Sequence, residues 1–184
     1  MRAELARPAG DRRVAEIVLD ADRIAARVSE LGGEIARYYP SGDLLVLGLL
    51  KGSFIFLGDL VRNIPRPLQV YFLVASSYGA GTTSSGEVRL VYDPETLLEG
   101  KHILLVEDIV DSGNTLNRLV RLLRQRKSRS LEICALLHKR IARGLELEPR
   151  FVGFDAPPLF LVGYGLDHAE HYRHLPYIAS LKES

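Results

Sequence analysis

The chain has a single cysteine, Cys134, and almost no net charge. Its 184 residues hold 24 Lys and Arg against 23 Asp and Glu, which gives a formal net charge of +1. One cysteine cannot close an intrachain disulfide, so nothing in the sequence calls for an oxidising compartment. We expect Cys134, inside the apolar run 131–137, to be a small buried hydrophobe. Proteins that bind nucleic acid non-specifically contact its phosphates with strongly basic surfaces. The near-neutral charge of this chain therefore argues against such binding.

The sequence also has no apolar segment long enough to span a membrane. The first eight residues lack the apolar stretch that is typical of a secretory signal. Residues 44–61 are rich in apolar side chains, but Lys51 and Asp59 interrupt them, and a span needs about 20 mostly apolar residues. We therefore expect a cytoplasmic protein with no membrane and no nucleic acid partner. The length and the absence of internal repeats predict one domain over 1–184.

Short apolar runs alternate with helical patterns along the chain. We expect helices over 20–38, 54–61 and 114–126, and strands over 44–50, 68–74, 102–106, 131–137 and 160–164. Asp20 is the expected N-cap of the first helix. Continuous apolar runs are typical of strands buried on both faces, so the pattern predicts an α/β domain with a mostly parallel sheet. We expect residues 1–13 to be a flexible tail and the small, polar segment 76–87 to be a mobile loop.

Carboxylates gather where the predicted strand 102–106 ends. Glu107 and Asp108 follow the strand directly and could accept hydrogen bonds from the two hydroxyls of a ribose. In open α/β sheets, ligands bind beyond the carboxyl ends of the strands. The alternative is that the acidic pair is simply solvated.

A tight turn over 111–115 then opens the next helix. Its free N–H groups and the helix dipole would make a phosphate site, to which Ser112 and Thr115 add hydroxyl donors. Gly113 lets the backbone come close to a ligand. The alternative is that Asp111 or Ser112 merely caps the helix.

The segment 106–116, VEDIVDSGNTL, resembles the phosphoribosyl-pyrophosphate motif of type I phosphoribosyltransferases. Four further segments, in the same order, resemble the hypoxanthine–guanine phosphoribosyltransferases of that family. They are the pyrophosphate loop at 50–53, the start of the catalytic lid at Ser77 and Tyr78, the purine-contacting segment 137–140 and the C-terminal hood at 151–177. The resemblance implies the type I phosphoribosyltransferase fold, a mostly parallel twisted sheet flanked by helices, with a small hood and a flexible lid loop.

The resemblance also implies a reaction. The family transfers a 5-phosphoribosyl group from phosphoribosyl pyrophosphate to N9 of hypoxanthine or guanine, giving IMP or GMP and pyrophosphate. With Mg²⁺ as cofactor, Glu107 and Asp108 would hold the ribose hydroxyls and one ion, and Asp167 would help to place a second. The 5-phosphate would lie on Asp111, Ser112, Gly113, Asn114 and Thr115.

The remaining implied roles concern the leaving group, the base and the lid. Lys51 with the Gly52 amide, and Arg173, would bind pyrophosphate, and the Leu50–Lys51 peptide is expected to be cis. The base would stack on Phe160, with Lys139 donating to O6 and the Leu161 carbonyl accepting from the 2-amino group of guanine. The catalytic roles implied are Asp111 as general base, with Lys51, Ser77 and Tyr78 around the reaction centre.

Several questions stay open at this point. Leu159 stands where many relatives carry a lysine, and Asn114 varies in the phosphate turn, so the ranking of hypoxanthine, guanine and xanthine is undecided. A xanthine-preferring enzyme and an RNA-binding regulator of the same fold are alternatives. The resemblance implies a homodimer or homotetramer, with Arg62, Asn63 and Ile64 near the subunit contact. The i, i+3, i+6 spacing of three histidines would put them on one helix face, as a metal site or as solvated side chains: His168, His171 and His174.

Overall fold

The computed structural model describes residues 14–77, 88–90, 98–140 and 144–182. Its centre is a sheet of six strands in the order β4-β3-β2-β5-β6-β7. All neighbours from β3 to β7 are parallel, and only β4 runs antiparallel, against β3. The strands are β2 (Leu44–Leu50), β3 (Gln69–Ser77), β4 (Val88–Leu90), β5 (His102–Val110), β6 (Ser130–His138) and β7 (Phe151–Asp155). The predicted α/β class with a mostly parallel sheet is confirmed.

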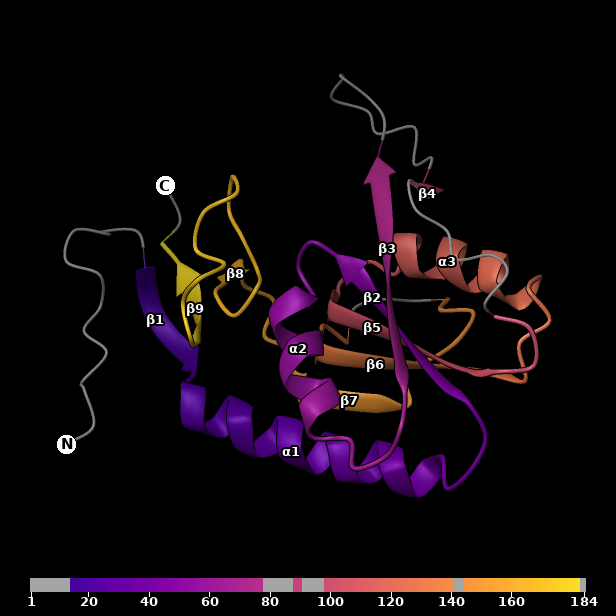
Figure 1. The fold of residues 1–184 in the computed structure, drawn as a ribbon. Helices are drawn as coiled ribbons and strands as arrows, with labels where there is room; N and C mark the ends of the chain where they lie inside the picture. Colours follow the sequence, from indigo (N-terminus) through magenta and orange to yellow (C-terminus); the bar gives the residue numbers. More distant parts are fainter. Residues whose placement is uncertain (1–13, 78–87, 91–97, 141–143, 183–184) are drawn as a thin grey trace.

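Helices cover both faces of this sheet. They are α1 (Ala21–Tyr38), α2 (Phe54–Arg62) and α3 (Asn114–Arg124), with α1 and α2 on one face and α3 on the other (Figure 1). Successive residues of β2 therefore enter different cores. Leu44 and Val46 pack with α1 and α2, whereas Leu45 and Leu47 pack with α3. This burial on both faces explains why β2 is apolar throughout.

Two local predictions about helix ends and the cysteine hold. The Asp20 side chain accepts a hydrogen bond from the backbone N of Arg23 at 2.8 Å, which makes it the N-cap of α1. Cys134 is buried on β6, and burial raises the pKa of its thiol far above the usual range, so it is an inert core residue.

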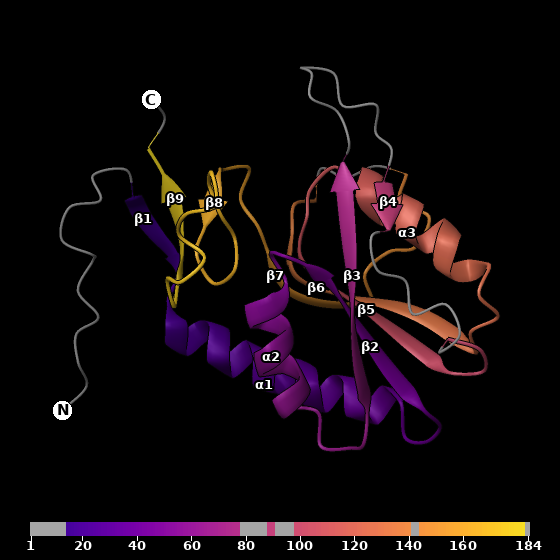
Figure 2. The ribbon, with the colours of Figure 1, turned by 45° about the horizontal axis from the view of Figure 1, so that its top comes forward.

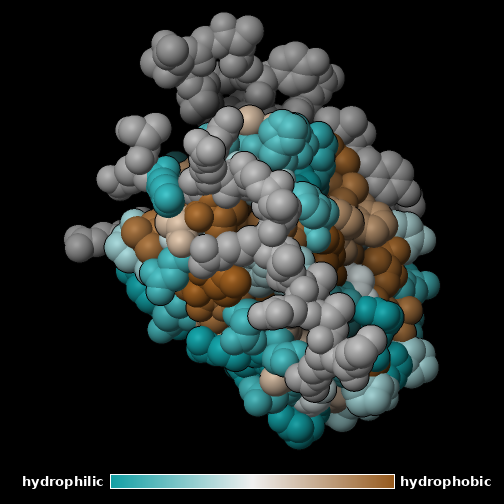
Figure 3. All heavy atoms as spheres, turned by 90° about the vertical axis from the view of Figure 1, so that its left-hand side faces the viewer, coloured by the Kyte–Doolittle hydropathy of each residue, from teal (hydrophilic) through white to brown (hydrophobic). Residues whose placement is uncertain are grey.

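A second, small sheet with its loops forms the hood, over residues 14–19 and 160–182. The predicted hood, 151–177, is wrong at its start, because Phe151–Asp155 is strand β7 of the central sheet. The small sheet has the order β1-β9-β8, all antiparallel, and consists of β1 (Val14–Leu19), β8 (Leu161–Val162) and β9 (Ile178–Leu181). In both ribbon views it lies beside the central sheet (Figure 1 and Figure 2). Seen from the side that carries β1, hydrophobic residues lie between hydrophilic ones (Figure 3). The hood has its own core, made of Val14, Val162, Tyr172, Leu175, Tyr177 and Ala179.

The structure corrects several predicted boundaries. The strand expected over 102–106 continues to Val110, so Glu107 and Asp108 lie within β5 and not after it. β3 continues to Ser77, so the first two residues of the loop predicted over 76–87 are strand. The strand expected over 160–164 is only Leu161–Val162, and the sequence patterns predict none of β1, β4, β7 and β9. Tyr78, the rest of that loop and the tail 1–13 lie outside the described residues. No helix within the described ranges is long and apolar enough to cross a membrane.

Candidate active site

A cavity of about 190 Å³ lies between the end of β5 and the start of α3. It is lined by Leu49, Glu107, Ile109, Val110, Asp111, Ser112, Gly113, Asn114, Thr115 and Leu116. Six of the predicted site residues are thus brought together in one place, at the carboxyl ends of parallel strands. Leu49 and Ile109 join them as apolar walls that the sequence analysis did not single out.

The two adjacent carboxylates of β5 differ in their surroundings. Glu107 is only 6% exposed, and burial together with the charge of Asp108 raises its pKa well above the usual range. Burial also raises the pKa of Asp108, while the backbone N of Ile109, which donates to its Oδ1 at 2.9 Å, and the positive charge of Arg173 lower it. The buried carboxylate of Glu107 and the half-buried carboxylate of Asp108 repel each other, so cations and hydroxyl donors are favoured ligands here.

The start of α3 carries no side-chain cap among the described residues. Its N-cap is Gly113, whose φ of 79° lies in the left-handed region, and Asp111 and Ser112 are exposed in the turn before it. The interpretation that Asp111 or Ser112 caps this helix is therefore wrong. The first-turn N–H groups of an uncapped helix stay available to an anion.

Asp111 instead forms an ion pair with Lys139. The lysine Nζ donates to Oδ2 of Asp111 at 3.0 Å, and the lysine side chain is 15% exposed against 53% for the aspartate. The backbone N of Lys139 donates to the carbonyl of Val110, which holds the end of β6 against the end of β5. The predicted general base and the predicted purine donor are therefore neighbours.

The loop after β2 touches both the carboxylates and the hood. A Cβ atom on Gly52 would lie 1.6 Å from Oδ2 of Asp108, so only glycine permits this approach. A Cβ atom on Gly165 would lie 2.1 Å from the Gly52 carbonyl oxygen, so the hood presses against the same loop. The Leu50–Lys51 peptide is cis, as the resemblance implies. The Lys51–Gly52 loop is thus placed between β5 and the hood.

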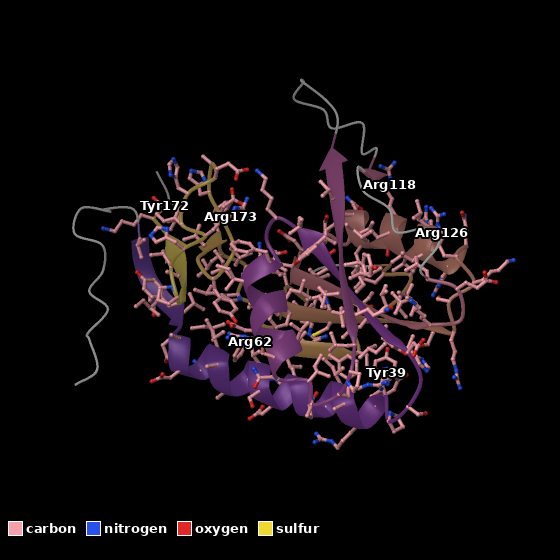
Figure 4. The ribbon with its side chains drawn as sticks, in the orientation of Figure 1. Tyr39, Arg62, Arg118, Arg126, Tyr172 and Arg173 are labelled. Atoms are coloured by element: carbon pink, nitrogen blue, oxygen red, sulfur yellow. The ribbon has the colours of Figure 1, made fainter. Side chains whose placement is uncertain are left out.

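Arg173 anchors a cluster of charges on the hood (Figure 4). Its NH1 donates to the Gly165 carbonyl at 2.8 Å, and its NH2 lies 2.8 Å from Asp167 and 3.3 Å from Glu170. Glu170 also pairs with Lys51, at 3.1 Å. The three predicted residues Lys51, Asp167 and Arg173 are therefore linked, through a glutamate that the sequence analysis did not name.

Phe160 lies exposed on the hood, just before β8. Its ring is 56% exposed, and its centroid lies 5.3 Å from that of His168, with the two planes at 88°. Leu161 is buried and pairs with Ser180 of β9. An exposed aromatic ring is unusual for a core residue, so Phe160 is not a plain core side chain.

The three histidines do not share a helix face. His168 and His171 bridge each other in a tight turn, and the segment to His174 contains turns and bends rather than a helix. The described ranges hold no group of three or more His, Cys, Asp or Glu side chains that could bind a metal by themselves. The helix-face idea is therefore wrong, because backbone turns at Ala169 and Glu170, both with positive φ, replace the expected helical spacing.

Comparison with known proteins decides the family. The model of the phosphoribosyl transferase domain matches residues 14–169. The chain belongs to the phosphoribosyltransferase family. This phosphoribosyltransferase is 47% identical over 172 residues to the hypoxanthine-guanine phosphoribosyltransferase of Dictyostelium discoideum, covering 91% of the chain and 96% of that relative. It is 45% identical over 169 residues to the enzyme of the same name from Bacillus subtilis, covering 92% and 94%.

Solved structures agree with this assignment. A hypoxanthine phosphoribosyltransferase from Staphylococcus aureus is similar with a TM-score of 0.87 and 41% identity, covering 92% of each chain. A hypoxanthine-guanine phosphoribosyltransferase from Bacillus anthracis is similar with a TM-score of 0.85 and 37% identity, covering 93% of this phosphoribosyltransferase and 99% of that chain. The expected type I phosphoribosyltransferase fold is confirmed.

Two residues of this phosphoribosyltransferase became visible only in the structure. Glu170 joins Lys51 to Arg173, and Asp59 of α2 accepts a hydrogen bond from the Tyr164 hydroxyl of the hood at 2.6 Å. The segment around Glu170 is not helical, so the i, i+3 spacing of Asp167, Glu170 and Arg173 gives no signal of its contact with Lys51. Nothing in the sequence pointed to the partner of Asp59.

Proposed function

We propose that the protein catalyses purine salvage, by transfer of 5-phosphoribosyl from phosphoribosyl pyrophosphate to N9 of hypoxanthine or guanine, with IMP or GMP and pyrophosphate as products. The observation that carries the proposal is the cavity that Glu107 and the uncapped start of α3 line together. The neighbouring carboxylate of Asp108 lies against Gly52, in the loop whose Lys51 is linked through Glu170 to Arg173. Breaking the C1–oxygen bond builds positive charge on the sugar and negative charge on the leaving group. The chain offers carboxylates for the first and cations for the second.

In this proposal the ribose 5-phosphate lies on the turn 111–115. The N–H groups at the start of α3 and the hydroxyls of Ser112 and Thr115 would donate to its oxygens, with the helix dipole adding to the attraction. Gly113 and Asn114 complete the turn. Glu107 and Asp108 would accept from the ribose hydroxyls, whose protons relieve the repulsion between the two carboxylates.

Residues of the site also suit Mg²⁺ as a cofactor. Mg²⁺ binds through one or two carboxylates together with waters and substrate oxygens, so it does not need a full set of protein ligands. The charge of Asp167 acts on Asp108, which places the two acids near each other, while Glu107 adjoins Asp108. Glu107 and Asp108 would hold one ion and Asp167 would help to hold a second. When bound, Mg²⁺ would neutralise part of the pyrophosphate charge as it leaves.

The leaving group would be bound by the loop after β2 and by the hood. The Lys51 ammonium, the Gly52 amide and the Arg173 guanidinium would donate to pyrophosphate oxygens. Arg173 is 18% exposed and is fixed by the Gly165 carbonyl, which suits a charge that must stay in place. Its Nε is buried and has no partner among the described residues.

Specificity for a 6-oxopurine would come from Lys139. Its ammonium is a pure donor, and O6 of hypoxanthine and guanine is an acceptor, whereas adenine presents an amino donor at that position. The base would stack on the exposed ring of Phe160, and the Leu161 carbonyl would accept from the 2-amino group of guanine. Leu159, beside Phe160, is 43% exposed and offers no polar contact to the base.

Asp111 would act as the general base on the purine ring. Its carboxylate is exposed, lines the cavity and is held by Lys139. Positioned proton transfer is typically worth about 10²–10⁴-fold in rate. Ser77, the last residue of β3, and Tyr78, with the loop that follows to 87, would close over the reaction centre and exclude water.

We also propose that the enzyme works as a homodimer or homotetramer. Three large hydrophobic side chains on α2 and β3 are exposed, namely Phe54, Val70 and Phe72, and a second copy of the chain would cover them. Arg62 and Asn63, at the end of α2, are exposed beside this region, while Ile64 is buried in the core. Light scattering of the purified protein measures the assembly directly.

The activity is tested by a spectrophotometric assay with phosphoribosyl pyrophosphate and Mg²⁺, using hypoxanthine, guanine, xanthine and adenine in separate reactions. The proposal predicts turnover with hypoxanthine or guanine and none with adenine. A clear preference for xanthine would favour the xanthine enzyme. Absence of turnover, combined with salt-sensitive binding of RNA, would favour the regulator.

A further inference from the structure

Glu170 lies between the two cations that the proposed function assigns to pyrophosphate. One carboxylate oxygen, Oε1, is 3.1 Å from Nζ of Lys51, and the other, Oε2, is 3.3 Å from NH2 of Arg173. Each oxygen thus neutralises a different cation. A bound pyrophosphate would contact the same two cations with two of its own oxygens.

The three residues differ in how firmly they are held. Arg173 is 18% exposed and has fixed partners in the Gly165 carbonyl and Asp167. Glu170 and Lys51 are 64% and 67% exposed. Exposed ion pairs contribute little to stability, so the glutamate side chain can leave Arg173 and Lys51 at small cost.

The backbone keeps Glu170 in this position when its side chain moves. Its N–H donates to Oδ2 of Asp167 at 2.9 Å, and its φ of 66° is part of the turn that also contains Ala169. The carboxylate can therefore swing away and return without rearrangement of the hood.

We propose that Glu170 is an internal counter-ion. In the unliganded enzyme its carboxylate occupies the place of the pyrophosphate oxygens, and it competes with pyrophosphate for Lys51 and Arg173. This inference rests on the proposed function, because it assumes that these two cations bind pyrophosphate. The competition weakens binding of the substrate's pyrophosphate group. It also speeds release of the product, since the carboxylate replaces the departing anion.

A different role for the same contacts is a structural tie between the Lys51–Gly52 loop and the hood. The two roles predict opposite results. If Glu170 is a tie, its removal loosens the site and weakens pyrophosphate binding. If Glu170 is a competitor, its removal tightens pyrophosphate binding.

The experiment is calorimetric titration of inorganic pyrophosphate, with Mg²⁺ present, into the wild type and into Glu170→Gln. We expect the Kd of Glu170→Gln to fall about three- to tenfold, since the two ion pairs of the exposed Glu170 carboxylate no longer compete. The matched control is Glu30→Gln on α1. Glu30 is also 64% exposed and also pairs with an arginine three residues away, Arg27. Its substitution should leave the Kd unchanged.

A third variant separates direct competition from a general effect of charge. Glu170→Asp keeps the negative charge but has one methylene less, so it cannot reach both cations as the glutamate does. We expect its Kd to fall as well, by less than that of Glu170→Gln. A Kd equal to that of the wild type would mean that only the charge matters, which overturns direct competition.

The outcomes also separate this inference from the proposed function. An unchanged or weaker affinity in Glu170→Gln, in a wild type that binds pyrophosphate and turns over hypoxanthine, overturns the counter-ion role alone. A wild type that neither binds pyrophosphate nor turns over any purine overturns the proposed function, and this inference with it. Thermal unfolding of each variant confirms that it is folded before titration.

Discussion

Asp111 and Lys139 form an ion pair 3.0 Å long between the turn after β5 and the end of β6. The proposed function gives them separate tasks, the first as general base and the second as donor to O6. Because of this contact, a purine that accepted a hydrogen bond from Lys139 would also lie within reach of Asp111. In the proposed reaction the pair would join recognition of the base to proton transfer.

Replacing the general base Asp111 should slow the reaction strongly and leave the fold intact. Because Asp111 is 53% exposed, Asp111→Asn should keep the melting temperature of the wild type and lose about 10²–10⁴-fold in kcat. Steady-state kinetics with hypoxanthine and thermal unfolding check both parts. The control is Asp43→Asn, at an exposed aspartate just before β2, at the opposite ends of the parallel strands. Wild-type turnover in a folded Asp111→Asn protein would remove this residue from the role.

Replacing the purine donor should affect substrate binding most. Lys139→Met keeps the length of the side chain and removes the ammonium, and a hydrogen bond to a charged group contributes about 1.5–3 kcal/mol. We expect KM for hypoxanthine to rise roughly 10- to 150-fold, since 1.4 kcal/mol is a factor of ten. Lys101→Met, which loses only an exposed contact with Gln69, is the control. Equal KM values in Lys139→Met and the wild type would contradict the assignment of O6 to Lys139.

The hydrogen bond between hood and α2 should stabilise the folded protein. The Tyr164 hydroxyl is 2.6 Å from Asp59, its residue is 7% exposed, and burial with this contact raises its pKa. Tyr164→Phe should lower the free energy of unfolding by about 1.5–3 kcal/mol. Tyr38→Phe also loses a hydrogen bond to a glutamate, Glu132 at 2.7 Å, but this one is exposed and should cost less than about 1 kcal/mol. Urea denaturation of Tyr164→Phe and Tyr38→Phe measures both losses in the free energy of unfolding. Equal losses would show that the buried hydrogen bond of the hood stabilises the protein no more than the exposed one.

Stability should fall in mild acid because of a buried histidine. His138 is 2% exposed, neither ring nitrogen has a hydrogen-bond partner among the described residues, and burial with the charge of Arg140 lowers its pKa. The folded state therefore favours the neutral ring, and protonation favours the unfolded state. The free energy of unfolding is therefore unaffected by protonation of His138 above about pH 6.5, the pKa of histidine in the unfolded chain. It decreases as the pH falls below that value, because the unfolded state then binds the proton more readily.

The variant His138→Val tests this origin of the acid sensitivity. Removing an unpaired buried polar ring should raise the free energy of unfolding by about 1–3 kcal/mol and reduce its change between pH 7.5 and pH 5.5. Urea denaturation at the two pH values gives both quantities. His171→Val, at an exposed histidine of the hood, should leave the pH dependence unaltered. Part of the acid sensitivity should remain in His138→Val, because burial also lowers the pKa of His102.

Local patterns in the sequence predict four of the six strands of the central sheet, β2, β3, β5 and β6, and the turn before α3. β2 is apolar throughout because it is buried on both faces, and Asp20 signals the start of α1 through its capping side chain. The position of the pocket could also be predicted, since eight of its lining residues are consecutive in the chain, from Ile109 to Leu116.

The hood and its charges depend on contacts between distant segments, which short patterns do not encode. β1 pairs with β9, which begins at Ile178, far along the chain. Because β1 is half-buried, its apolar run is too short to predict a strand from the sequence. Glu107 and Asp108 looked like residues after a strand, because carboxylates rarely continue one, yet pairing with β6 extends β5 through them. Glu170 meets Lys51 across 119 residues of chain, and only the folded hood brings them together.

The most direct test of the proposed site is a crystal structure of the protein with GMP bound. We expect the 5-phosphate on the N–H groups at the start of α3, the ribose against Glu107 and Asp108, and the base between Phe160 and Lys139. Nucleotide at another place on the protein, or an empty pocket at saturating GMP, would contradict the proposed site.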